Sequence, residues 1–277
     1  AERCVRILNP LSADLNVMRQ TLLFNMLEAV ALNVNRKNGD LKLYEFGNCY
    51  FYDEAKRSEA DRLAPYSEEY RLAIAVTGVS TPHSWNTKPG KASFFTLRAV
   101  AEKLLRRFGI DIYALETETL ESDLFSEGLT MALNGRELLR IGSVTPAIRR
   151  RTDLKQEVYF LEMNFDVLVR STRKHRIVAA ELSKFPEVKR DLALLIDKRV
   201  TFSELRDAAF AAERKLLRSV SLFDVYEGDK LPEGKKSYAL SFVLEDKTRT
   251  LDEKTIERVM GNLVRQFEQR CGAQVRA

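Results

Sequence analysis

Three stretches near the end of the chain decide the fold: FPEVKRDLALLID (Phe185–Asp197), SVSLFDVYEGDKLPEGKKSYALSFVLED (Ser219–Asp246) and TRTLDEKTIERVMGNLVRQFEQRCGAQVR (Thr248–Arg276). Together with residues 202–214, they predict strands over 188–197, 220–227, 236–245 and 273–276, and helices over 202–214 and 252–270. The resulting βαββαβ order is that of the ferredoxin-like domain. In that arrangement both helices cover one face of an antiparallel sheet and leave the other face open.

The alternation of side chains along the predicted strands separates a core face from an open face. Successive side chains of a strand point to opposite sides, and only the bulky sets can fill a core against the helices. The predicted core sets are Leu192, Leu194 and Ile196; Phe223 and Val225; and Tyr238, Leu240, Phe242 and Leu244. The predicted open face carries Ala193, Asp224, Tyr226, Ser237, Ala239 and Ser241.

The predicted open face has the chemistry that single-stranded RNA requires. Small side chains let a base approach closely, Tyr226 offers a ring for stacking, and Asp224 accepts hydrogen bonds from base edges. From spacing alone, an RNA-binding face, a protein interface and an ordinary surface strand are equally compatible with this pattern. Basic residues predicted near the face favour RNA, because phosphates need counter-charges: Arg190, Lys235, Lys236, Arg249 and Arg276.

The preceding residues predict a second domain of a different kind. Apolar residues recur at helical spacing over 19–37 and 94–109, and strand-like runs cover 41–51, 71–78 and 158–164. Asn134 and Gly135 between two alternating arms are the signal of a type I′ hairpin. We therefore predict an α+β chain with a mostly antiparallel module over residues 1–170, a charged linker over 171–183 and the ferredoxin-like domain over 184–277.

The bulk composition limits the classes of function. A length of 277 residues fits two domains, and 45% hydrophobic with 31% charged residues is typical of a globular protein. With no apolar run of the roughly 18 residues that span a bilayer and no signal-peptide pattern, we expect a cytoplasmic protein without a membrane partner. The first residue is Ala, so we expect a fragment of a longer protein. The net charge of +5 mildly favours a polyanionic partner.

No residue pattern for a catalytic or metal site occurs in the sequence. The three cysteines and two histidines offer no metal-ligand spacing. No G-x-G is present, so the chain lacks a Gly-rich phosphate cradle, and no Arg accompanies Glu45 in its predicted strand, as a class II synthetase site would need. We therefore predict no catalytic and no metal-binding residues, and we expect Arg19 to pair with neighbouring carboxylates rather than with a phosphate.

Residues 184–277 resemble the ferredoxin-fold anticodon-binding domain of bacterial phenylalanyl-tRNA synthetase β subunits. The matching strings are FPEVKRDLAL, SLFDVYEG, GKKSYALSF, the RTL of TRTLDEK and the final GAQVR. The resemblance implies that Tyr226 stacks on the first anticodon base, with Asp224, Ser237 and Ala193 beside it. The predicted tRNA-binding residues are Asp224, Tyr226, Ser237, Ala193, Arg190, Lys236, Arg249 and Arg276.

The first module is similar to the synthetase-like module of the same family. The matching stretches are NPLSADLNVMRQTLLFNMLEAVALNVNRK (Asn9–Lys37), YEFGNCYF (Tyr44–Phe51), the Trp85 region and FFTLRAVAEKLL (Phe94–Leu105). Ser93 stands where the family usually has Asp, and FSEGL and GSVTP replace its HPG and GELHP strings. The resemblance implies an inactive class II synthetase-like module that pairs with a catalytic α subunit, two α with two β. ATP and Mg²⁺ would belong to that holoenzyme and no cofactor to this fragment.

Two other functions are weighed against a subunit of a phenylalanine–tRNA ligase. A stand-alone RNA-binding or assembly protein could use the helices over 19–37 and 94–105 as a homodimer interface. An independent ligase is disfavoured, because the ATP-binding elements of the class II site are missing. Size measurement with and without a co-expressed α subunit distinguishes the first two.

Overall fold

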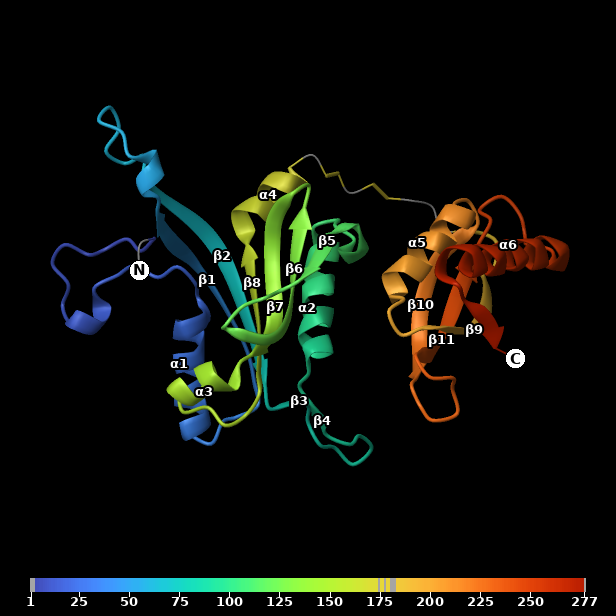
Figure 1. Ribbon diagram of the computed structural model, residues 1–277, viewed down its shortest axis with the longest axis horizontal. Helices are drawn as coiled ribbons and strands as arrows, with labels where there is room; N and C mark the ends of the chain where they lie inside the picture. Colours follow the sequence, from blue (N-terminus) through green and yellow to red (C-terminus); the bar gives the residue numbers. More distant parts are fainter. Residues whose placement is uncertain (1–2, 174, 177, 180–182, 277) are drawn as a thin grey trace. The chain divides into compact units, whose positions relative to one another are not determined.

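The computed structural model describes residues 3–173, 175–176, 178–179 and 183–276 (Figure 1). The chain divides into two compact units, Ala1–Ile177 and Val178–Ala277. Helix α4 (Phe165–Thr172) continues past the predicted module boundary at 170 and ends two residues inside the predicted linker. Residues 174, 177 and 180–182 of that linker lie outside the described residues.

The first unit is built on a six-stranded antiparallel sheet with the order β1-β2-β8-β7-β6-β5. Its strands are β1 (Leu41–Tyr52), β2 (Tyr66–Thr77), β5 (Glu116–Thr119), β6 (Phe125–Leu133), β7 (Arg136–Val144) and β8 (Val158–Asn164). A separate two-stranded ribbon pairs β3 (Val79–Thr81) with β4 (Gly90–Lys91). The other helices are α1 (Leu23–Asn35), α2 (Phe94–Arg107) and α3 (Pro146–Arg151), with 3-10 turns at Ala13–Leu15, Glu54–Lys56 and Ile112–Ala114.

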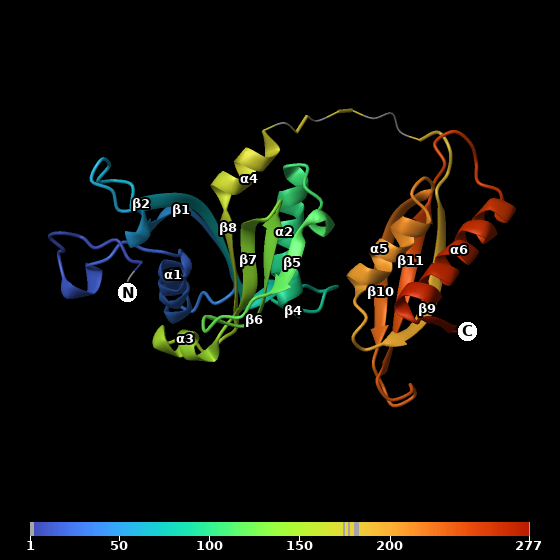
Figure 2. The same ribbon diagram turned by 45° about the horizontal axis from the view of Figure 1, so that its top comes forward.

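Helices cover both faces of this sheet, which therefore has two cores (Figures 1 and 2). On one side Leu27 of α1 belongs to the same buried cluster as Ala73 of β2. On the other side Leu97 of α2 and Leu168 of α4 are buried in one cluster with Leu72 of β2. Leu72 and Ala73 are neighbours on opposite faces, so β2 is buried on both sides. This explains why its sequence is a continuous apolar run rather than an alternating one.

Two local features shape the first unit, the predicted hairpin turn at Asn134 and Gly135 and a cap at Ser93. Asn134 and Gly135 join β6 to β7 with φ angles of 53° and 70°, the positive values that a type I′ turn requires. Ser93 caps α2: its hydroxyl accepts from the Thr96 amide, and the Thr96 hydroxyl accepts from the Ser93 amide, both at 3.2 Å. Serine and aspartate are both strong N-caps, so the change from the family's Asp keeps the local role.

Helix α1 begins at Leu23, later than the predicted start at residue 19. The carboxylate of Glu162, on β8, accepts a hydrogen bond from the Leu22 amide at 2.7 Å and from the Thr21 hydroxyl at 2.8 Å. This distant carboxylate therefore does the work of a local N-cap residue, because it satisfies donors that the first helical turn leaves unpaired.

The second unit has the predicted βαββαβ order. Its elements are β9 (Val188–Asp197), α5 (Phe202–Ala212), β10 (Leu217–Tyr226), β11 (Lys235–Leu244), α6 (Glu253–Cys271) and β12 (Gln274–Arg276). The strands form an antiparallel sheet with the order β10-β11-β9-β12. This arrangement confirms the predicted ferredoxin-like domain.

Both helices of the second unit pack on the same face of its sheet. Leu205 of α5 and Phe267 of α6 are fully buried in one cluster with Leu240 and Phe242 of β11. The Phe242 and Phe267 rings lie 5.9 Å apart between centroids. The core residues predicted on β9 and β11 belong to this cluster or pack against it. The second face of the sheet is thereby defined, and it carries the predicted site.

Candidate nucleic-acid interface

Two rows of side chains cross the face of the second sheet that lies opposite its helices, called here the open face. Strand register places Tyr226, Ser237, Leu195 and Gln274 in one row, and Asp224, Ala239, Ala193 and Arg276 in the next. The two rows lie about 7 Å apart along the strands, since each residue advances about 3.4 Å. Five of the eight predicted tRNA-binding residues therefore share one patch: Asp224, Tyr226, Ser237, Ala193 and Arg276.

The side chain of Arg276 reaches across the open face toward Tyr226. Its guanidinium carbon lies 5.8 Å from the centroid of the Tyr226 ring, although the two residues belong to the two edge strands of the sheet. Alanine at positions 193 and 239 leaves room for this crossing. The result is an aromatic ring and a cation side by side above a floor of small side chains. This combination suits a stacked base and its phosphate.

A β-bulge in β10 corrects the predicted faces of that strand. The register shifts between Leu222, paired with Leu240, and Asp224, paired with Ala239. Phe223 is the extra residue and is 59% exposed, and Val225 is 48% exposed, so the predicted place of both in the core is wrong. Leu222 packs against the core instead. The bulge lets Asp224 and Tyr226 stay on the open face even though Leu222 faces the helices.

Arg190 and Lys236 do not lie on the open face. Arg190 is opposite Phe242 in the register, on the helix-covered side, and its guanidinium bonds both carboxylate oxygens of Glu253 at 2.9 and 3.0 Å. Lys236 is opposite Ile196 and only 7% exposed, with its ammonium 4.6 Å from the Tyr238 ring centroid. Both were predicted as tRNA-binding residues, and both have structural partners on the other face.

The remaining basic residues near the site, Arg249 and Lys235, each form an ion pair with an aspartate. Arg249 lies in the loop after β11 and pairs with Asp246 at 3.4 Å, with its side chain 65% exposed. Lys235 pairs with Asp197 at 3.2 Å, beyond the row that contains Tyr226. Exposed ion pairs of this kind hold their side chains weakly, so Arg249 remains available to an anion.

Gly228 is a site residue that sequence reasoning missed. A Cβ atom built at Gly228 would lie 2.5 Å from the Tyr226 hydroxyl oxygen and 2.6 Å from the ring carbon that carries it. The Tyr226 ring therefore lies directly against the backbone of Gly228. The string YEG could have indicated this contact, because a glycine two positions after an exposed aromatic residue allows the ring to pack against the backbone.

We expect Gly228→Ala to displace the Tyr226 ring without unfolding the domain. The new methyl group would overlap the ring, whose side chain can rotate away, so the free energy of unfolding should change by less than about 1 kcal/mol. Nuclear Overhauser contacts between the Tyr226 ring and residue 228 should weaken or disappear. Gly261→Ala is the matched control, because a Cβ there meets nothing within 4 Å. Unchanged ring contacts in Gly228→Ala would contradict the packing.

A buried ionic cluster in the first unit occupies the start of α1. Arg71 bonds Glu162 at 2.5 Å and Glu69 at 2.7 Å. Burial opposes the charge of Arg71, but these two carboxylates outweigh it and raise the pKa of the guanidinium. Burial, assisted by Glu162, also raises the pKa of the Cys49 thiol to about 11. The charged groups of this cluster pair with one another, so the cluster stabilises the fold of the first unit.

Arg19 pairs with a carboxylate, as predicted. Its guanidinium bonds Glu45 at 2.7 Å and the Asn48 carbonyl at 3.0 Å, and it passes over Gly47, where a Cβ would lie 2.1 Å from it. The Arg that accompanies Glu45 thus comes from the segment before α1 and not from β1 itself. The pair leaves the Arg19 guanidinium engaged by protein groups.

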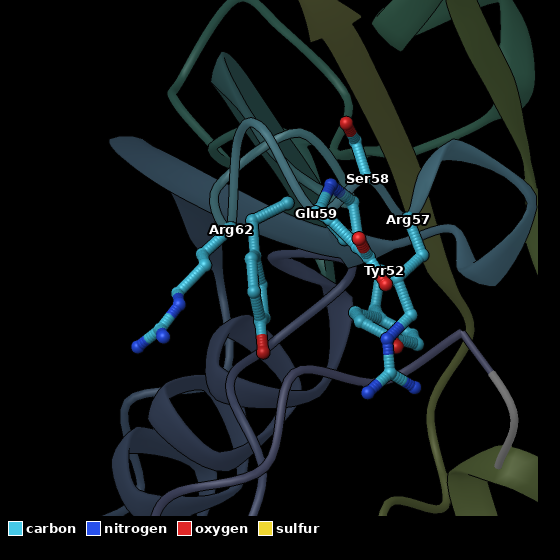
Figure 3. Close-up of a pocket in the computed structure, with 7 residues that line it drawn as sticks. Tyr52, Arg57, Ser58, Glu59 and Arg62 are labelled. Carbon is cyan, nitrogen blue, oxygen red and sulfur yellow. The ribbon is translucent and has the colours of Figure 1, made fainter.

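A hollow of about 780 Å³ lies in the connection between β1 and β2 (Figure 3). In Figure 3 Arg62 lies on the left side of the view and Arg57 on the right, with Tyr52 beside Arg57. Arg57 pairs with Glu54 at 3.1 Å, and the Tyr52 hydroxyl donates to the same carboxylate, which raises the pKa of Tyr52. Residues 53–65 carry four acidic and three basic side chains. This mixture does not favour a polyanion.

The described residues contain neither a metal-ligand cluster nor a membrane-spanning helix. Among them, no group of three or more His, Cys, Asp or Glu side chains could hold a metal ion. Within the same part of the chain, no helix is long and apolar enough to cross a bilayer.

Comparison with known proteins defines the class to which this arrangement belongs. The family model described as the phenylalanyl tRNA synthetase beta chain CLM domain matches residues 1–165, and the ferredoxin-fold anticodon binding domain matches residues 183–276. The two units are therefore a synthetase-like module and an anticodon-binding domain. The chain belongs to the phenylalanyl-tRNA synthetase β-chain family.

The relatives of known name agree with this family. The chain is 46% identical over 277 residues to the phenylalanine–tRNA ligase beta subunit of Bacteroides fragilis. The match covers 100% of this chain and 34% of that protein. The subunits of Bacteroides thetaiotaomicron and Porphyromonas gingivalis are 46% and 44% identical, over 98% and 99% of this chain and 33% and 34% of theirs. The chain thus spans about a third of the length of these relatives.

Proposed function

We propose that this chain is the part of a phenylalanine–tRNA ligase β subunit that binds the anticodon of phenylalanine-specific tRNA. The observation that carries the proposal is the pairing of Tyr226 and Arg276 across the open face, with Asp224 and the small side chain of Ala193 in the neighbouring row. Family membership supports the same role, since the second unit matches the anticodon-binding family.

Each residue of the patch has a distinct task in this proposal. Tyr226 stacks on the first anticodon base, Asp224 accepts hydrogen bonds from that base, and Arg276 offsets the charge of a phosphate. Ser237 is paired with Tyr226 in the same row and is 6% exposed, so its task is to support the platform. Arg249 contributes as a mobile counter-charge from its loop.

The first unit, in this proposal, supports the reaction without performing it. The cation Arg19 and the Arg71 cluster are bonded to carboxylates of the chain itself, which supports a non-catalytic module. Adenylation of phenylalanine would then take place on an α subunit, which would hold ATP and Mg²⁺. We propose an assembly of two α and two β subunits, in the cytoplasm.

Binding of tRNA with altered anticodons tests this function. Filter binding with phenylalanine-specific tRNA and with the same tRNA changed only at the first anticodon base should show a loss of about tenfold or more, which corresponds to about 1.4 kcal/mol. A base change in the acceptor stem is the control and should leave binding to this chain unchanged. Equal affinity for both anticodons would refute the proposal.

Co-expression with an α subunit tests the partner separately. The chain should elute with α as a larger complex during size-exclusion chromatography. A stable homodimer that ignores α would instead support the stand-alone RNA-binding protein.

A further inference from the structure

The ribbon of β3 and β4 presents the single tryptophan of the chain at its tip. Trp85 is 95% exposed, although tryptophan is among the residues that gain most from burial. In Figure 1 the connection between β3 and β4 extends away from the six-stranded sheet. An aromatic side chain this exposed calls for a functional explanation.

The tip that carries Trp85 is held by a closed turn. Ser84 and Thr87 pair as a bridge, with amide-to-carbonyl distances of 3.1 and 3.3 Å, and they enclose Trp85 and Asn86. The Ser84 hydroxyl bonds the Asn86 side-chain oxygen at 2.8 Å. At the base, the Ala92 amide donates to the Gly78 carbonyl at 2.8 Å. Because the backbone is already ordered, a ligand of Trp85 would lose little binding free energy to loop ordering.

The charged side chains near Trp85 in the ribbon are positive, and the Asp40 carboxylate lies at the base of the ribbon, where it accepts from the Val79 amide at 2.7 Å. No Asp or Glu occurs between Glu69 and Glu102, whereas Lys88 and Lys91 follow Trp85 in the ribbon and are exposed. The ammonium of Lys42 bonds the Ser80 carbonyl at 3.0 Å and adds a third positive charge at the base of the ribbon. Asp40 offsets charge only at the base, so the exposed lysines beside the exposed ring are complementary to a polyanion that carries aromatic bases.

We propose that the β3–β4 ribbon is a second RNA contact, in which Trp85 stacks on an unpaired base and Lys88 and Lys91 bind the adjacent phosphates. This contact would extend RNA binding to the first unit and does not depend on the Tyr226 patch. Base stacking tolerates any sequence, so the ribbon selects single-stranded or unpaired RNA rather than a particular base.

The fluorescence of Trp85 tests the proposal directly, because no other tryptophan contributes. The probe is a single-stranded oligoadenylate of about a dozen nucleotides, long enough to cover such a site. It should quench the emission of the wild-type chain and of Tyr226→Ala equally. Trp85→Ala should weaken binding of the labelled oligonucleotide by about 5- to 150-fold, the range of one stacked base. The Tyr226→Ala arm separates this result from any failure of the anticodon site.

The salt dependence of oligonucleotide binding tests the role of Lys88 and Lys91. The double change Lys88→Ala with Lys91→Ala should reduce the slope of log affinity against log salt by about 1.4, since each phosphate contact to a single strand contributes about 0.7. Lys155→Ala, an exposed lysine outside the ribbon, is the control and should leave the slope unchanged. No binding of the oligonucleotide, or binding without a change in Trp85 emission, overturns the proposal. The proposal is also overturned if an α subunit changes the emission of Trp85 and RNA does not, because the ribbon would then be a protein contact.

Discussion

Replacing Tyr226 with alanine should weaken binding of phenylalanine-specific tRNA by about 5- to 150-fold, the range that one stacked base contributes. The ring is 37% exposed on an edge strand, so its loss leaves the core of the second unit intact. Filter binding to this chain measures the effect. ATP–pyrophosphate exchange by the assembled ligase should stay near the wild-type rate, because the site of adenylation lies elsewhere in the proposed assembly.

Two further variants make the result specific to the open face. Tyr226→Phe keeps the ring and should retain most of the affinity. Arg190→Ala removes a positive charge from the helix-covered side, where Glu253 holds it, and should change binding little. Equal losses of tRNA binding and of pyrophosphate exchange in Tyr226→Ala, or an undiminished affinity, would count against the open face as the anticodon site.

Replacing Glu162 with alanine should destabilise the first unit by about 3–5 kcal/mol, the usual cost of removing one partner of a buried ion pair. Glu162 is 6% exposed and accepts from the Leu22 amide, the Thr21 hydroxyl and Arg71. Its removal leaves the Arg71 guanidinium with Glu69 as its remaining carboxylate and takes the acceptor from the Leu22 amide and the Thr21 hydroxyl. Hydrogen exchange followed by mass spectrometry, read in the peptides of α1 and β8, measures the loss within the first unit alone.

The control for Glu162 is a carboxylate with the same partner type at the surface. Glu45→Ala removes the Arg19 pair, in which both side chains are about a third exposed, and should cost at most about 1 kcal/mol. Exchange in the second unit should be unaffected by either change. A Glu162→Ala protein whose α1 amides exchange as slowly as those of the wild type would show that the cluster contributes little.

Strands β9 and β11 of the second unit were predictable because their side chains alternate without interruption. The predicted strand 188–197 coincides with β9, in which Leu194 and Ile196 are buried. The same alternation places Arg190 on the face of Leu194, and it places Lys236 on the face of Tyr238. Both residues were predicted near the RNA face, whereas the alternation of side chains places them on the helix-covered face.

Other features depend on contacts that no local pattern contains. The bulge at Phe223 breaks the alternation along β10, and the amino-acid sequence gives no local signal for it. The start of α1 depends on Glu162, which lies 140 residues from Leu22. The crossing of Arg276 to Tyr226 required the order of all four strands, which brings the last strand within reach of β10.

The bulge at Phe223 has a consequence for self-association. As an outer strand, β10 offers unpaired amides and carbonyls, and the exposed Phe223 and Val225 beside them would favour the addition of a strand from another copy. A foreign strand needs an unbroken ladder of equally spaced bonds, and the extra residue interrupts it midway. The bulge that places Asp224 on the open face therefore also disfavours aggregation through the edge strand β10.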